Sequence, residues 1–178
     1  MNTKIIILAA GKGQRMKNGN GLPKVLAPLN GQPLILHLLH RVKQSEIDSC
    51  PILVVGHGAE QVRQTCGPAY TYVEQIEQLG TAHAVEQALP SVPKNTDAII
   101  VLYGDHPLTS SLTIKTLHLL HQGTEADISL LTATVPHFNG LQKPFYDFGR
   151  IIRDKITGNI THIIEKKDAE PEELDIRE

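Results

Sequence analysis

Apolar residues lie along the chain in short continuous runs, and segments with a helical repeat separate these runs. The first run covers residues 4–8, and similar runs cover 51–56, 70–74 and 98–103. Continuous apolar runs of this length are typical of strands that are buried on both faces, as in a parallel sheet. The pattern therefore predicts four strands of such a sheet.

The segments between these runs predict helices. Pro33 is suited to the first position of a helix because it has no N–H group to lose. Thr81 and either Ser110 or Ser111 are suited to N-caps, and Gly123 is a typical helix terminator. The expected helices cover residues 33–44, 60–66, 82–89 and 110–122.

The pattern changes after residue 135. Residues 127–135 are rich in β-forming residues, so strands and helices alternate up to that point. Such alternation predicts an α/β fold with a mainly parallel sheet. Beyond it, residues 149–153 and 159–165 predict a β-hairpin around 154–158, and the charged segment 165–178 is expected to be a solvated helix or tail.

The composition argues against several classes of protein. The 178 residues fit one domain, and the net charge of −2 is unlike the basic excess of nucleic-acid-binding proteins. Cys50 and Cys66 show no metal-ligand spacing and are expected to be reduced thiols. No apolar run approaches the roughly 20 residues of a membrane span, and the first run is too short for a signal peptide. We therefore expect a cytoplasmic protein that binds neither nucleic acid nor a membrane.

A glycine-containing loop follows the first strand. Its pattern is Gly11-x-Gly13-x-Arg15, and Lys24 follows on a Pro-containing loop. The loop is not a dinucleotide fingerprint, because Met16 stands where a third glycine is needed, and no Gly-Lys-Ser/Thr sequence makes it a Walker loop. Backbone N–H groups of such a turn can bind phosphate, and the basic side chains can offset the charge of a polyphosphate. A simple tight turn is an equally common use of Gly-x-Gly.

Two further clusters also follow predicted strands. Asp105 comes directly after the strand at 98–103, where a lone carboxylate either caps the next turn or binds Mg²⁺ together with substrate phosphates. Gln75 offers both a donor and an acceptor to the edge of a pyrimidine, and Gly80 allows a flat base to approach the backbone. Because ligands of open α/β sheets bind at the carboxyl ends of the strands, the shared position of these clusters strengthens each of them. His83 and His106 lie beside these clusters and are expected to position other groups or to be incidental.

Several segments occur in the order found in one family of nucleotidyltransferases. They are Leu8-Ala-Ala-Gly-Lys-Gly-x-Arg-Met16, Leu22-Pro-Lys-Val-Leu26, Val55-Gly-His-Gly58, Glu77-Gln-Leu-Gly-Thr-Ala-His83, Leu102-Tyr-Gly-Asp-x-Pro-Leu108, Phe148-Gly-Arg-Ile151 and Ile164-Glu-Lys-Lys-Asp-Ala169. From residue 4 to residue 178 the chain resembles the N-terminal pyrophosphorylase domain of bacterial bifunctional N-acetylglucosamine-1-phosphate uridyltransferases. The first segment marks the wider nucleotide-diphospho-sugar transferase superfamily. The segments around Gly80 and Asp168 are typical of the uridyltransferase branch.

The resemblance implies a Rossmann-like, three-layer α/β/α fold and a reaction of cell-wall biosynthesis. UTP and N-acetylglucosamine 1-phosphate would give UDP-N-acetylglucosamine and pyrophosphate. Arg15 and Lys24 would be catalytic, Asp105 would bind Mg²⁺, and Gly149 and Glu165 would hold the amino sugar. The nucleotide would be bound by residues at the ends of the strands: Leu8, Ala9, Ala10, Gly11, Gln75, Gly80, Thr81, Tyr103 and Gly104.

The chain also departs from the family pattern. The segment 17–21 makes the phosphate loop longer than is usual for the family. A sugar-binding Asn, a second metal-ligand Asn and the β-helix acetyltransferase domain would all lie beyond residue 178. We therefore expect a single nucleotidyltransferase domain over 1–178 that is truncated at its C-terminus and turns over slowly or not at all. Two alternatives stay open: a binding module without catalysis, and a nucleotidyltransferase for another nucleotide or sugar phosphate. The sequence leaves the oligomeric state open.

Overall fold

The structure is a computed structural model, and it describes residues 1–11 and 22–178. The chain divides into two compact units, residues 1–127 and residues 128–178. Each unit is described by itself. The expectation of a single domain stays a prediction.

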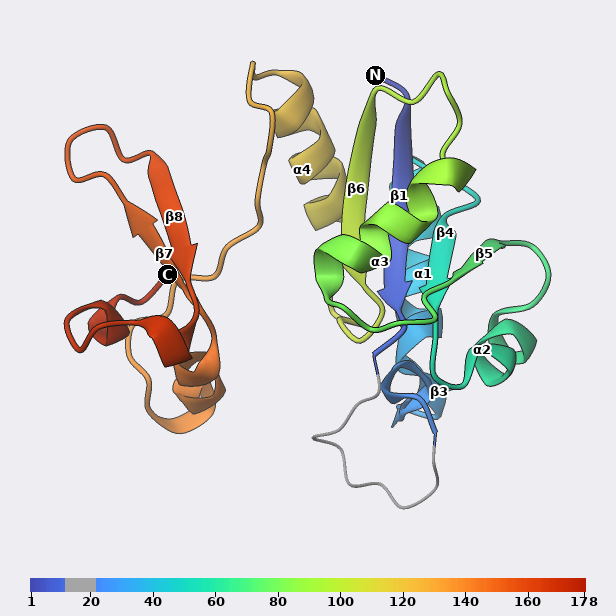
Figure 1. Ribbon diagram of the computed structural model, residues 1–178, viewed down its shortest axis with the longest axis horizontal. Helices are drawn as coiled ribbons and strands as arrows, with labels where there is room; N and C mark the ends of the chain where they lie inside the picture. Colours follow the sequence, from blue (N-terminus) through green and yellow to red (C-terminus); the bar gives the residue numbers. More distant parts are fainter. Residues whose placement is uncertain (12–21) are drawn as a thin grey trace. The chain divides into compact units, whose positions relative to one another are not determined.

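A four-stranded parallel sheet forms the centre of the first unit (Figure 1). Its strands are β1 (Thr3–Ala9), β4 (Ile52–Val55), β5 (Thr71–Glu74) and β6 (Ala98–Tyr103), in the order β5-β4-β1-β6. β1 pairs in parallel with both β4 and β6. Ile5, Ile6 and Ile7 are completely buried, which explains why this strand reads as a continuous apolar run. The four strands predicted from the sequence are confirmed.

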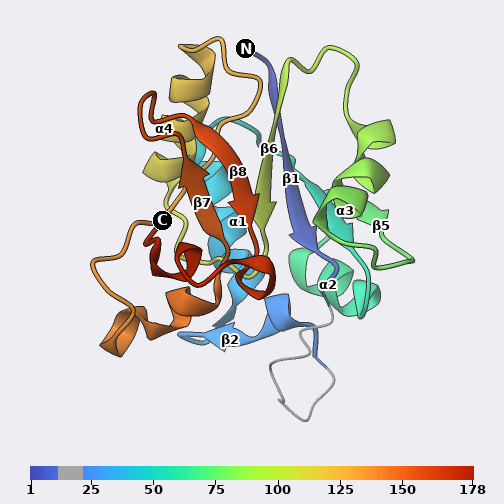
Figure 2. The same ribbon diagram turned by 60° about the vertical axis from the view of Figure 1, so that its left-hand side comes forward.

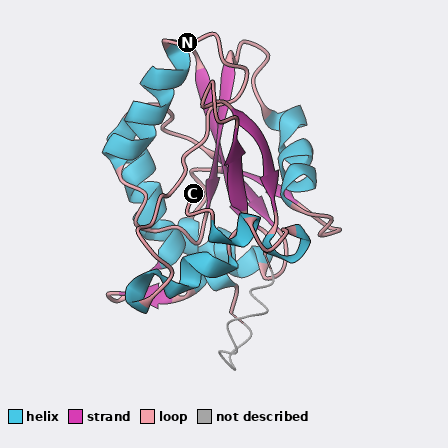
Figure 3. Ribbon diagram, turned by 90° about the vertical axis from the view of Figure 1, so that its left-hand side faces the viewer, coloured by secondary structure: helices cyan, strands magenta, loops and turns pink. Residues whose placement is uncertain are grey.

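Helices cover both faces of this sheet. They are α1 (Leu34–Ser45), α2 (Ala59–Cys66), α3 (Thr81–Ala88) and α4 (Ser111–Gln122). Ile5 and Ile7 pack in one apolar cluster with residues of α1, α2 and α4, whereas Ile6 packs in a second cluster with Ala84 and Ala88 of α3. In Figure 1, α3 crosses in front of β1 and α1 lies behind it, and Figure 3 shows helices on both sides of the strands. The three-layer α/β/α prediction is therefore confirmed.

Two helix starts differ from the sequence prediction. Pro33 is the residue before α1 and pairs in the short strand β3, so it is not the first helical residue. Thr81 is the first residue of α3, and Gly80 occupies the N-cap position with φ of +115°. Only glycine adopts such a backbone conformation without strain. Of the two N-caps that the sequence left open, Ser110 and Ser111, Ser110 is the N-cap, because its hydroxyl accepts a hydrogen bond from the Thr113 N–H at 3.0 Å.

The segment before α1 holds Lys24 in place. A 3-10 turn covers Lys24–Leu26, and β2 (Pro28–Leu29) pairs antiparallel with β3 (Gln32–Pro33). Pro23 packs against Gly58, where an added Cβ would come within 2.4 Å of the proline ring. Gly58 also has φ of +70°. The Gly-His-Gly segment after β4 therefore leaves room for the Pro that precedes Lys24.

The second unit contains an antiparallel hairpin (Figure 2). It consists of β7 (Arg150–Arg153) and β8 (Ile160–Ile164), as the sequence predicted. The 3-10 turns of this unit cover Gly140–Asp147, Lys166–Asp168 and Glu173–Asp175, so the charged tail is neither an extended helix nor featureless. Residues 127–135 form no strand, so that prediction was wrong. β-branched and apolar residues form a strand only where a partner strand satisfies their backbone, and here no ladder pairs with them.

Arg150 is the organising side chain of this unit. It is 1% exposed, and its guanidinium donates to the backbone carbonyls of Tyr146, Phe148 and Leu174. The same group lies 4.8 Å from the centre of the Phe138 ring. These contacts tie the hairpin to the loops on either side of it. Across the part of the chain that the structure describes, no helix is long and apolar enough to span a membrane.

Candidate functional site

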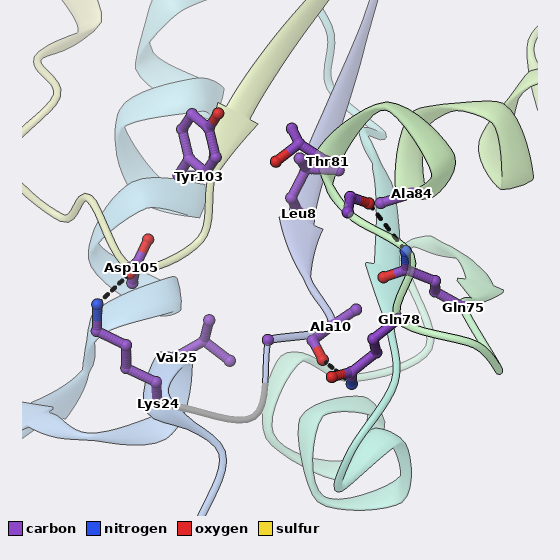
Figure 4. A pocket seen from close by; sticks show the side chains of 12 residues that line it. Leu8, Ala10, Lys24, Val25, Gln75, Gln78, Thr81, Ala84, Tyr103 and Asp105 are labelled. Atoms are coloured by element: carbon purple, nitrogen blue, oxygen red, sulfur yellow. Dashed lines mark hydrogen bonds and ion pairs between the residues drawn. The ribbon is translucent and has the colours of Figure 1, made fainter. Parts of the chain in front are cut away.

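A cavity of about 270 Å³ lies at the carboxyl ends of the parallel strands of the first unit (Figure 4). This is the edge of an open α/β sheet where ligands bind. Its lining comes from β1, the Lys24 turn, the β5–α3 segment, and the end of β6. The lining residues are Leu8, Ala10, Gly11, Lys24, Val25, Gln75, Gln78, Gly80, Thr81, Ala84, Tyr103 and Asp105.

One side of the cavity carries opposite charges. The Lys24 Nζ lies 2.5 Å from the Asp105 Oδ2, and the two side chains are 42% and 21% exposed. The His106 Nε2 lies 3.9 Å from the Asp105 Oδ1, and its ring stacks at an angle on Tyr103 with centroids 5.2 Å apart. Both charges therefore remain within reach of a ligand in the cavity.

Gly104 brings these charged groups together. Its N–H donates to the Leu8 carbonyl at 2.9 Å, which continues the pairing of β1 and β6. An added Cβ would come within 3.0 Å of that carbonyl and 3.1 Å of Val25. The absence of a side chain thus allows the end of β6 to pack against β1 and the Lys24 turn, so that Asp105 meets Lys24.

The opposite side of the cavity is neutral and polar. The Gln75 side chain is 4% exposed, and its Nε2 donates to the Gly80 carbonyl at 3.1 Å. The same nitrogen lies 3.0 Å from the His83 Nδ1. Figure 4 shows the Gln75 oxygen directed into the cavity. This wall can form hydrogen bonds with a flat polar ligand without adding charge.

Gln78 connects the two sides of the cavity. Its Nε2 donates to the Ala10 carbonyl at 2.6 Å, joining the β5–α3 segment to the end of β1. Gln78 belongs to one of the segments shared with the family, but it was not predicted as a site residue. Val25 and Ala84 were likewise not predicted as lining residues, because their apolar character suits an ordinary core position equally well.

The structure gathers most of the predicted site residues. The ones that line the cavity are Leu8, Ala10, Gly11, Lys24, Gln75, Gly80, Thr81, Tyr103 and Asp105. Ala9 is 1% exposed and packs in the core, and Gly104 lies behind the lining against Leu8. Arg15 lies outside the residues that the structure describes, as do Lys12 and Met16.

The two predicted sugar-binding residues belong to the second unit. Arg150 pairs with Ile164, so Gly149 and Glu165 flank the same end of the β7–β8 hairpin. An added Cβ at Gly149 would lie 3.0 Å from the Ile164 carbonyl, which shows how closely the two strands approach there. Glu165 is exposed.

Among the described residues that line the cavity, Asp105 is the one with a carboxylate. Within residues 1–11 and 22–178, no group of three or more His, Cys, Asp and Glu side chains is arranged to hold a metal ion. A zinc-type site with several protein ligands is therefore not present among these residues. A single carboxylate in an open cavity fits Mg²⁺, which commonly takes one or two carboxylates and completes its shell with water and substrate phosphates.

Comparison with known proteins agrees with this geometry. The model of the MobA-like NTP transferase domain family matches residues 5–161. The bifunctional protein GlmU of Heliobacterium modesticaldum is 42% identical over 173 residues, which are 97% of this chain and 35% of that protein. The chain thus spans about a third of the length of this relative.

Solved structures share the fold. A putative glucose-1-phosphate thymidylyltransferase from Bacillus anthracis superposes with a TM-score of 0.72 at 21% identity, over 98% of this chain and 67% of that one. The manganese complex of Rv0371C from Mycobacterium tuberculosis superposes with a TM-score of 0.58 at 22% identity, over 70% of this chain and 62% of that one. At this level of identity, the two structures support the fold alone.

Proposed function

Since the chain belongs to the MobA-like NTP transferase domain family, we propose that it transfers a uridylyl group from UTP to N-acetylglucosamine 1-phosphate. The products are UDP-N-acetylglucosamine and pyrophosphate. The choice of substrates rests on the sequence resemblance described above and on the 42% identity to a GlmU protein. The cytoplasmic location expected from the sequence stays a prediction.

One observation carries the proposal: a single cavity has a charged wall and a neutral polar wall. Lys24 and Asp105 form the first wall, and Gln75 and Gly80 form the second. A nucleoside triphosphate has the matching division into a polyphosphate and a base. The base would lie against Gln75, and the phosphates would extend toward Lys24.

The chemistry requires charge stabilisation more than proton transfer. The attacking oxygen belongs to a sugar phosphate that is already ionised, so no general base is needed. Lys24 would bind the α-phosphate and stabilise the negative charge that develops on its oxygens during in-line displacement. Arg15 is proposed to assist on the leaving pyrophosphate, on the basis of the family motif.

Asp105 is proposed to hold Mg²⁺ together with the nucleotide phosphates. When bound, the cation would neutralise charge on the phosphoryl oxygens. Asp105 is suited to this role because its carboxylate is partly exposed and lines the same cavity. The remaining ligands would come from substrate and water.

The sugar end of the substrate is proposed to contact Gly149 and Glu165. This assignment rests on the resemblance to the family, and the hairpin geometry supports it by bringing the two residues to one end of β7 and β8. Glu165→Gln keeps the shape of the side chain and removes its charge. We expect this substitution to raise the KM for the sugar phosphate and to leave the KM for UTP nearly unchanged.

The proposal is tested by incubating the chain with UTP, N-acetylglucosamine 1-phosphate and Mg²⁺ and measuring pyrophosphate. Lys24→Ala and Asp105→Asn should each lower kcat/KM by roughly 10²–10³, the loss typical of removing one group that stabilises a transition-state oxyanion. Lys115→Ala is the matched control, because Lys115 pairs with Glu46 and does not line the cavity. Its kcat/KM should remain within about twofold of the parent, as is usual for an exposed ion pair.

Calorimetry with UTP and UDP-N-acetylglucosamine separates a binding module from an enzyme, since a module binds without releasing pyrophosphate. Pyrophosphate release with CTP and not with UTP would contradict the choice of nucleotide. A chain that neither binds nor converts any nucleotide would contradict the whole proposal.

A further inference from the structure

The terminal amide of Gln75 is held in one orientation before any ligand binds. Its Nε2 lies 3.1 Å from the Gly80 carbonyl oxygen, which can only accept a hydrogen bond. If the amide were rotated by 180°, two acceptor oxygens would face each other. The Gly80 carbonyl therefore favours the orientation in which the nitrogen points toward it and the oxygen Oε1 points away.

His83 completes this arrangement. Its Nδ1 lies 3.0 Å from the same Gln75 nitrogen, so the second N–H of the amide has a partner when Nδ1 accepts. The imidazole then carries its proton on Nε2, which lies 3.2 Å from the Nε2 of the exposed Gln87. Two donors cannot bond to each other, so the Gln87 amide must turn its oxygen toward His83 in this state. Both N–H groups of Gln75 are thus used within the protein, which leaves only its oxygen for a ligand.

The partners of this amide are themselves fixed. The Gly80 carbonyl also accepts the Ala84 N–H at 3.1 Å, in the first turn of α3. The Gln75 N–H donates to the Val55 carbonyl at 2.8 Å, continuing the pairing of β5 with β4. The side chain is 4% exposed, so water has little access with which to replace these bonds. Among the described residues no donor meets Oε1, and Figure 4 shows this oxygen directed into the cavity.

We propose that His83 is a specificity-determining positioning residue: it holds the Gln75 amide so that a pure acceptor faces the base. An acceptor matches a base whose ring nitrogen carries hydrogen, as N3 of uracil and thymine does. It opposes a base whose ring nitrogen is itself an acceptor, as N3 of cytosine is. A freely rotating amide could serve either base, so the selection arises from the lock and not from Gln75 alone.

This inference rests on the proposed nucleotide site, and two side chains of equal size test it. His83→Asn places an oxygen where Nδ1 stands, so it can still accept from Gln75. His83→Leu places a methyl group there and accepts nothing. Glu86→Leu, at an exposed position of the same helix, controls for an added apolar side chain on α3.

Binding of UTP and of CTP is measured for each protein by calorimetry in the presence of Mg²⁺. We expect the parent to bind UTP more tightly than CTP. His83→Leu should reduce the ratio of the two affinities roughly tenfold, the effect of one hydrogen bond. His83→Asn and Glu86→Leu should keep the ratio within about twofold. A general loss of stability would lower the affinities for UTP and CTP equally and leave their ratio unchanged.

A second measurement needs no nucleotide. The side-chain NH₂ signals of Gln75, assigned with Gln75→Glu, are followed by NMR in the free proteins. We expect them to be shifted and protected from exchange in the parent and in His83→Asn, and to lose this protection in His83→Leu or, if that variant does not fold, in His83→Ala.

The outcomes separate this inference from the proposed function. If the parent binds no nucleotide, the proposed function fails, and the NMR measurement alone decides whether His83 locks Gln75. If the parent selects UTP and His83→Leu selects it equally well, the specificity role of His83 is wrong while the function stands. Gln75 amide protons that exchange in the parent as fast as those of the exposed Gln64 would overturn the lock itself.

Discussion

Among the described residues of the first unit, 1–11 and 22–127, the largest buried side chains are aliphatic, whereas in residues 128–178 the largest buried side chain is an arginine. Ile5, Ile6 and Ile7 are inaccessible within the sheet of the first unit. In the second unit, which the structure describes throughout, only Val135 and Arg150 are buried. The first unit therefore owes its stability mainly to the removal of apolar surface from water. The second unit depends on the hydrogen bonds that one buried guanidinium, that of Arg150, donates to backbone carbonyls.

The two kinds of interior respond differently when a buried side chain is substituted. An aliphatic core loses stability in proportion to the atoms removed and the cavity left behind. Removing a buried guanidinium breaks all of its hydrogen bonds at once, and each buried carbonyl that is left without a donor lowers the free energy of unfolding. The contrast explains why a parallel sheet forms its own core, while a two-stranded hairpin needs an additional anchor.

The largest expected effect comes from the aliphatic interior. Ile6→Ala should lower the free energy of unfolding by about 2–5 kcal/mol, because Ile6 is completely buried between β1 and α3. Ile163→Ala in β8 should cost less than about 1 kcal/mol, since that side chain is 54% exposed. Both are measured by urea denaturation. Equal losses at the two positions would contradict the comparison.

The second effect concerns the polar anchor. Arg150→Met should destabilise the hairpin unit by about 3 kcal/mol, because the carbonyls of Phe148 and Leu174 lose their donor inside the protein. Arg153→Met is the matched control on the same strand. Its guanidinium pairs with Glu178 at 41% exposure, so we expect a clearly smaller loss than for Arg150→Met. The loss of stability in each variant is measured by hydrogen exchange of the β7 and β8 backbone amides. Similar protection of these amides in the two variants would show that Arg150 is not an anchor.

The same contrast explains what could be predicted from the sequence. The aliphatic strands were predicted because their apolar runs report burial on both faces directly. The hairpin was predicted from two β-forming segments joined by a turn around residues 154–158. Residues 127–135 have similar β-forming composition and form no strand, because composition does not reveal whether a partner strand is available.

The candidate site was only partly accessible to the same reasoning. Asp105 and Gln75 stood out as polar residues that directly follow strands. The hydrogen bond from Gln78 to Ala10 joins residues far apart in the sequence, so no local pattern reports it. The same holds for the packing of Pro23 on Gly58, which depends on how separate segments meet in space. His83 was expected beside the Gln75 cluster, but the sequence did not indicate which atoms it contacts.

Two glycines extend the comparison to packing density. Gly58 and Gly158 have nearly the same φ, +70° and +73°, so alanine is strained at either position by about 1 kcal/mol. At Gly58 the new Cβ would also meet the Pro23 ring at 2.4 Å, whereas at Gly158 it would meet nothing within 4 Å. We expect Gly58→Ala to cost about 2 kcal/mol or more in thermal unfolding and Gly158→Ala about 1 kcal/mol. Equal costs would mean that the first unit is no more tightly packed there than the second.

The perturbed ionisable groups of the two units also have opposite causes. Burial raises the pKa of the Cys66 thiol to about 11 in the first unit, because the charged thiolate loses its water. In the second unit, hydrogen bonds from Arg153 and then from Thr132 lower the pKa of the Glu178 carboxyl to about 2. Burial thus disfavours a charge in one unit, and pairing favours a charge in the other.

The smallest expected effect follows from the carboxyl of Glu178. Its pKa is lower in the folded unit than the ordinary value of 4.5, so its contribution to stability is present above pH 4.5 and is lost as the pH falls toward 2. NMR signals of β7 and β8, recorded in a titration between pH 6 and 2, should show the hairpin loosening over that interval. Glu178→Gln removes the ionisable group and should flatten this part of the profile, leaving only the response of the other carboxylates. A parent and a variant with the same profile would show that the Arg153 pair contributes nothing to the hairpin, and that Arg150 alone distinguishes it from the aliphatic unit.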